Sequence, residues 1–129
     1  MPKDKGGSYP AEWLKKAQQD FQRVTRRLKE EDLEDAAFHL QQAIEKSLKG
    51  YLLSTGWKLK KTHDLEALLD DAVKTAPNLE SYRDLCQQVT GYYLVERYPA
   101  LGPAPSVGEI ESGYRSARQF IDQILNKVN

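Results

Sequence analysis

Six side chains in residues 37–52, AFHLQQAIEKSLKGYL, have the types and spacing for a shared binding surface. If this stretch is helical, they fall on two neighbouring lines that point away from the apolar stripe. An imidazole, an amide, a carboxylate and two ammonium groups would then surround a phenylalanine ring: Phe38, His39, Gln42, Glu45, Lys46 and Lys49. The ammonium groups suit phosphate, and the whole face suits a ligand or a partner chain.

A plainer interpretation of this face is a solvated surface with one ion pair. Glu45 and Lys49 are one helical turn apart, and such a pair stabilises a helix by about 0.2–0.5 kcal/mol. Phe38 argues against full solvation, because its ring would expose a large apolar area unless a partner covered it. The sequence leaves both interpretations open.

A second histidine follows in the stretch THDL, residues 62–65. Thr62 or Asp64 is expected to cap the next helix, since both side chains accept hydrogen bonds from backbone amides. His63 is a candidate for binding or acid–base chemistry, although a loop histidine that hydrogen-bonds locally explains it as well.

The stretch GYYLVERYP, residues 91–99, combines aromatic rings with a guanidinium group. Tyr92 and Tyr93 are consecutive and cannot both face one core, so at least one should point to another surface. Arg97 offers a planar fork for phosphate or carboxylate, and it could stack on these rings or on Tyr98. The alternative is a cation that simply favours a helix C-terminus.

Established catalytic signatures are absent from the sequence. It contains no glycine-rich phosphate loop with its lysine, no CxxC, no HExxH and no GxSxG. The two histidines have no partner at a metal-ligand spacing, so we expect no metal and no cofactor other than a nucleotide ligand. Cys86 lies among apolar neighbours in a helical pattern, and we expect it in the core rather than as a nucleophile.

Length and charge favour one intracellular domain. The chain has 129 residues with 19 basic and 19 acidic side chains, so any anion site must be local. No run approaches the roughly 20 apolar residues that span a bilayer, and one cysteine cannot form an internal disulfide. We expect a soluble cytoplasmic protein that makes no membrane contact, with a flexible tail at residues 1–9 and a single domain at residues 10–129.

Apolar residues recur at steps of three and four in five segments, which predicts an all-helical fold. The first helix begins at Pro10, the second is capped by Asp32 and ends near Gly56, and the third precedes Pro77. The second helix should bury one stripe: Ala37, Leu40, Ile44, Ser47, Leu48 and Tyr51.

The fourth helix should be capped by Asn78 and fail after Leu94, because three prolines follow. Its stripe is Leu79, Tyr82, Cys86, Val89 and Tyr93. Ser106 and Glu109 form a capping box before the fifth helix, whose stripe is Ile110, Gly113, Ala117, Ile121, Ile124 and Val128. We therefore predict an all-α antiparallel up-and-down bundle of four long helices and a shorter third one.

With these elements in place, the chain resembles the HEPN domain family. The resemblance rests on AFHLQQAIEKSLKGYL, on THDLEALL and on the YY...RYP element before the last helix, and it covers nearly the whole chain. It implies a helical bundle, commonly a homodimer, that is often encoded beside a minimal nucleotidyltransferase in a two-component or toxin–antitoxin pair.

Many members of the wider superfamily are ribonucleases, and this sequence departs from their catalytic motif. Their motif is an arginine followed after four to six residues by a histidine. The residues five to seven places before His39 and before His63 include no arginine, and no histidine follows Arg97. The matching residues instead resemble the nucleotidyltransferase-associated branch.

Three functions therefore remain from the sequence. The first is a homodimeric module that binds a nucleotide or a nucleotidyltransferase, with Lys46, Lys49 and Arg97 on phosphate and a tyrosine on the base. The second is a divergent ribonuclease toxin that uses His39 or His63 with Arg97 on RNA. The third is a purely structural dimerising bundle without a small ligand.

Overall fold

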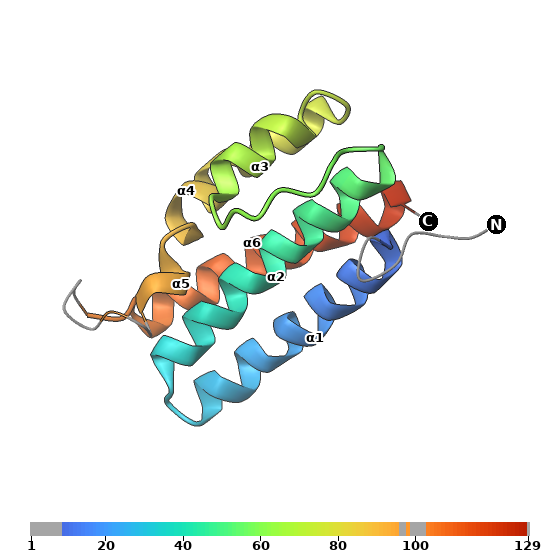
Figure 1. The fold of residues 1–129 in the computed structure, drawn as a ribbon. Helices are drawn as coiled ribbons and strands as arrows, with labels where there is room; N and C mark the ends of the chain where they lie inside the picture. The colour runs from blue at the N-terminus through green and yellow to red at the C-terminus, as the bar shows by residue number, and fades with distance from the viewer. Residues whose placement is uncertain (1–8, 96–97, 99–102, 129) are drawn as a thin grey trace.

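The computed structural model describes residues 9–95, 98 and 103–128 (Figure 1). Three long helices lie side by side: α1 (Pro10–Lys29), α2 (Leu33–Ser54) and α6 (Val107–Val128). Three shorter helices cover another side of α2: α3 (Leu65–Ala72), α4 (Arg83–Val89) and α5 (Tyr92–Val95). The 3-10 helix η1 (Pro77–Tyr82) packs against α3, α4 and α6. The described residues contain no strand, and the predicted all-helical bundle is confirmed.

The helix starts predicted from the capping residues Asp32, Asp64 and Ser106 are confirmed. The Asp32 side chain accepts from the amide of Asp35, and that of Asp64 accepts from two amides at the start of α3. Ser106 and Glu109 exchange the two hydrogen bonds of a capping box at 3.1 and 2.9 Å. Gly56 follows α2 with a φ of 91°, a left-handed conformation that costs glycine little.

The segment from Pro77 to Val95 departs from the prediction of one long helix. It divides into η1, α4 and α5, with a turn at Thr90 and Gly91. Asn78 is not an N-cap as we expected, because its side chain bonds Gln123 and Lys127 of α6 instead. The turn also changes which tyrosine is buried: Tyr92 is 8% exposed, whereas Tyr93, placed in the core stripe by its spacing, is half-buried.

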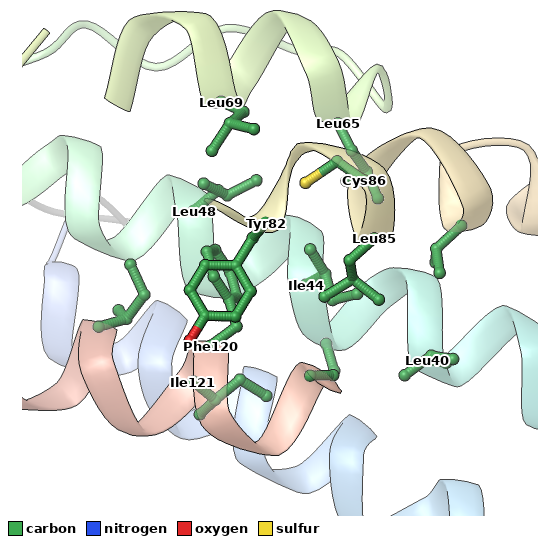
Figure 2. Close-up of a cluster of buried hydrophobic side chains, with 14 of the residues drawn as sticks. Leu40, Ile44, Leu48, Leu65, Leu69, Tyr82, Leu85, Cys86, Phe120 and Ile121 are labelled. Atoms are coloured by element: carbon green, nitrogen blue, oxygen red, sulfur yellow. The ribbon is translucent and has the colours of Figure 1, made fainter. Parts of the chain in front are cut away.

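Helix α2 is the central element of the fold. It packs against α1, α3, α4, α5 and α6, and its predicted stripe is buried as expected. Figure 2 shows Leu40, Ile44 and Leu48 of α2 among apolar side chains of the surrounding helices. The contact with α1 is close at Gly50, where a Cβ atom would lie 2.7 Å from Leu14 Cδ2. Because so many elements surround it, α2 is buried well beyond one stripe.

Within the described residues, no helix combines the length and the apolar character needed to cross a membrane.

Candidate functional site

Asp20 of α1 fixes two of the candidate residues on α2. Its side chain is almost fully buried, with Oδ1 2.8 Å from His39 Nδ1 and Oδ2 2.6 Å from Lys46 Nζ. The other ring nitrogen of His39, Nε2, lies 3.3 Å from the Asp35 carboxylate. Both imidazole nitrogens therefore contact carboxylates of the same chain, which suits a structural link between α1 and α2 better than acid–base chemistry.

Glu45 and Lys49 form a buried ion pair on the same helix. Their side chains are 5% and 6% exposed, and Lys49 Nζ lies 2.8 Å from Glu45 Oε2. The other oxygen, Oε1, accepts from Gln41 Nε2 at 2.9 Å and lies 2.8 Å from His63 Nδ1. The Lys49 ammonium also lies 5.7 Å from the centre of the Trp13 ring, a cation–π arrangement. Both charges are thus satisfied inside the fold.

These contacts correct our expectation that the polar face of α2 points away from the packing. Glu45 and Lys49 are buried, and the other four are half-buried: Phe38, His39, Gln42 and Lys46. The Gln42 amide donates to Gln41 at 2.7 Å. The physical reason is that α1 and residues 55–64 supply partners for a helix that we expected to be covered on one side only.

His63 is the candidate residue that combines exposure with a fixed orientation. Its side chain is 48% exposed, yet Nδ1 is held by the buried carboxylate of Glu45. The ring packs on Tyr93 with 4.4 Å between ring centres and an angle of 33° between the planes. Residues 63 and 93 are far apart in the chain. They meet because α5 lies beside the residues that immediately precede α3 (Figure 1).

An open groove of about 430 Å³ lies beside this ring pair. Its described walls come from the start of α3 with the residues before it, and from α5 with the turn before it: Thr62, His63, Asp64, Glu66, Thr90, Gly91, Tyr93 and Leu94. Thr90 ties the two walls together, because its hydroxyl accepts from the Leu65 amide at 2.9 Å and lies 3.5 Å from the His63 carbonyl. The arrangement offers an aromatic surface and an imidazole to a small ligand.

The remaining candidates are distributed around this groove or outside it. Tyr92 is part of the buried core, where its hydroxyl accepts from Gln88 and burial raises its pKa. Tyr98 is 53% exposed. Arg97 lies outside the described residues. The structure therefore brings together His63, Tyr93 and Glu45, and it places His39 and Lys46 in a separate cluster around Asp20.

Sequence reasoning missed Asp20, Gln41 and Thr90, although two of them left a signal. Asp20 falls on the apolar stripe of α1, between Ala17 and Val24, where a charged residue requires a partner. Gln41 stands one helical turn before Glu45. Thr90 carries no comparable signal, because its role depends on a turn that the sequence pattern did not predict.

The core assignment of Cys86 is confirmed. The residue is fully buried, and burial raises the pKa of its thiol to about 12, which leaves no reactive thiolate near neutral pH. Among the described residues, no group of three or more histidine, cysteine, aspartate and glutamate side chains is placed to hold a metal ion.

Comparisons with known proteins agree with this architecture. The chain is similar to TT1696 from Thermus thermophilus, whose crystal structure superposes with a TM-score of 0.81 at 26% sequence identity. The match covers 92% of this chain and 97% of TT1696. No curated protein sequence matches the chain. The family model of the HEPN domain matches residues 10–128, and the chain therefore belongs to the HEPN domain family.

Proposed function

We propose that this HEPN-domain protein is a nucleotide-binding interaction module that works with a minimal nucleotidyltransferase. The observation that carries the proposal is the groove beside His63 and Tyr93. A base can stack on a half-buried aromatic ring, and such stacking contributes about 1–3 kcal/mol per base. The imidazole of His63 adds a polar contact at a position that Glu45 fixes.

The proposed ligand contacts are narrower than the set the sequence suggested. His63 and Tyr93 line the groove and are retained as ligand contacts. Tyr98 and Arg97 are also retained, because they follow Tyr93 closely in the chain. Lys46 and Lys49 are omitted, because their ammonium groups are paired with Asp20 and Glu45. His39, Gln42 and Tyr92 are also engaged within the fold.

Tyr93→Ala tests the groove directly. Loss of a stacking surface worth about 1–3 kcal/mol is expected to weaken nucleotide binding by about 5- to 150-fold. Isothermal titration calorimetry with ATP, GTP and the corresponding monophosphates measures the change. Tyr9→Ala is the matched control, since Tyr9 precedes α1, whose start lies far from α5 (Figure 1).

Two results would contradict the proposal. If the wild-type protein gives no binding heat with any of these nucleotides, the binding function is wrong. If binding occurs but Tyr93→Ala leaves the affinity unchanged, nucleotides bind elsewhere and the groove is the wrong site. The partner is tested separately: a minimal nucleotidyltransferase encoded next to this protein should copurify with it, and light scattering should show a homodimer or a complex of the two chains.

A divergent ribonuclease is the second candidate, and the contact between Glu45 and His63 favours it. A carboxylate that holds one imidazole nitrogen leaves the other free to move a proton, and Nε2 of His63 forms no hydrogen bond or ion pair with a described residue. The ring nitrogen and the adjacent groove are the minimum that a general base for RNA cleavage needs.

If the protein cleaves a labelled RNA, His63→Ala is expected to abolish the cleavage. His39→Ala is expected to leave the cleavage unchanged, because both ring nitrogens of His39 contact carboxylates. Gel analysis of the products after incubation with the purified proteins measures both. Cleavage that survives His63→Ala would exclude His63 as the base, and intact RNA with the wild-type protein would leave the binding module as the function.

A further inference from the structure

The described residues in the walls of the groove include no cation for a nucleotide phosphate. Within the part of the chain that the structure describes, the lining has two carboxylates, Asp64 and Glu66, and no lysine or arginine. Asp64 caps α3, and Glu66 accepts from Gln87 at 3.0 Å. Arg83 Nη1 lies 3.9 Å from a Glu66 carboxylate oxygen and offsets part of that charge. A phosphate inside the groove would still lie beside the Asp64 carboxylate, which forms no ion pair with a described residue. Phosphate groups of a bound nucleotide should leave the groove rather than enter it.

A basic run lies next to the groove along the chain. Residues 57–61, WKLKK, contain three exposed lysines: Lys58, Lys60 and Lys61. Lys60 Nζ lies 3.1 Å from the Asp71 carboxylate, whereas the side chains of Lys58 and Lys61 form no ion pair or hydrogen bond with any described residue. Two ammonium groups are therefore available to an anion from solution.

The run is held in place at both ends. At one end the Trp57 ring donates through Nε1 to Asp71 at 2.9 Å, and this bond together with Lys60 lowers the pKa of the Asp71 carboxyl. At the other end Gln41 donates to the His63 carbonyl at 3.4 Å. Figure 1 shows this green segment returning along α2 toward the start of α3 and α5. Lys61 is separated from His63 by two residue steps, at most about 7 Å of extended chain.

We propose that Lys58 and Lys61 form a phosphate subsite for a nucleotide whose base lies against Tyr93 and His63. The inference rests on the proposed nucleotide-binding function and adds the place where the charged part of the ligand binds. A lysine ammonium is a compact charge that binds phosphate without demanding one geometry, which suits an exposed segment. The same chemistry would hold the phosphate chain of a mononucleotide or the backbone of a short single strand.

The double variant Lys58→Gln/Lys61→Gln tests the subsite in the full-length protein. Its control is Lys15→Gln/Lys29→Gln, which removes the same total charge from exposed positions of α1. Binding of AMP, ATP and a five-nucleotide RNA is measured by calorimetry or fluorescence anisotropy at several salt concentrations. We expect the first double variant to weaken binding by about tenfold at low salt, and the control to change it less than about twofold.

The ligands distinguish the two sources of phosphate. If the ligand is a mononucleotide, ATP binds more tightly than AMP and this preference disappears in Lys58→Gln/Lys61→Gln. If it is a strand, the RNA shows the tenfold loss, and the slope of log affinity against log salt falls by about 0.7 for each lost contact.

Wild-type affinity and salt slope in Lys58→Gln/Lys61→Gln, or an equal loss in the control, would overturn the subsite. If Tyr93→Ala weakens binding and the lysine variant does not, the phosphate subsite is wrong while the nucleotide-binding function stands. If the wild-type protein binds none of the three ligands, both proposals are wrong.

Discussion

Replacing Lys49 with methionine is expected to destabilise the fold by about 3–5 kcal/mol, the usual cost of removing one partner of a buried ion pair. Both side chains of the ion pair are buried, with Lys49 6% and Glu45 5% exposed. Methionine can fill the space of the lysine stem, so the loss should come mainly from the uncompensated carboxylate. Since a domain of this size is stable by roughly 5–15 kcal/mol in total, a large fraction would disappear.

Denaturant unfolding followed by circular dichroism measures the change in the free energy of unfolding, provided that the m-value stays constant. Lys74→Met is the matched control, because Lys74 is 74% exposed in its ion pair with Asp71 and should contribute less than about 1 kcal/mol. The double variant Lys49→Met/Glu45→Gln should recover part of the loss, since it removes the buried charge as well.

A loss below about 1 kcal/mol in Lys49→Met would mean that the Glu45 carboxylate is reached by water or satisfied by its other partners. A double variant that is less stable than Lys49→Met would show that the carboxylate contributes through Gln41 and His63 rather than through the lysine. In either case the ion pair would not be the main reason for the burial of this face.

The fold was predictable because its signals are local. The three- and four-residue spacing of apolar side chains, the caps at Asp32, Asp64 and Ser106, and Gly56 each act within one or two helical turns. The break at Thr90 and Gly91 was not predictable in the same way, because an apolar stripe continues through it to Tyr93 in the sequence. A regular pattern conceals a turn when the residues after the turn resume at a spacing close to the helical one.

The site was only partly predictable, because its contacts join distant parts of the chain. The chemistry of His63, Tyr93 and Glu45 was visible from residue types, but their association depends on where α5 lies. The polar face of α2 was misread for a related reason. The partners that bury it lie 18 to 26 residues away, at Asp20 and His63, and helix periodicity contains no information about them.

Phe120 illustrates the same limit in the core and provides the second large effect. The sequence assigned α6 one narrow stripe through Ala117 and Ile121, without Phe120, yet Phe120 is fully buried. It packs edge to face against Tyr82, with 5.0 Å between ring centres. Figure 2 labels both residues among the buried side chains. Because α1, α2, η1 and α4 all contact α6, that helix buries a wider face than a single stripe.

Phe120→Ala is expected to cost about 3–5 kcal/mol, from lost burial of the ring and from the cavity left beside Tyr82. Phe120→Leu should cost less, because it leaves a smaller cavity.

The matched control is Phe38→Ala: Phe38 is half-buried and lies outside the core cluster, so the same change should cost about 1 kcal/mol or less. Denaturant unfolding of the three variants measures the difference, and equal losses at Phe120 and Phe38 would mean that the ring of Phe38 packs as tightly as the core. A small loss at Phe38 would show that the stability of the single chain does not depend on this half-buried ring.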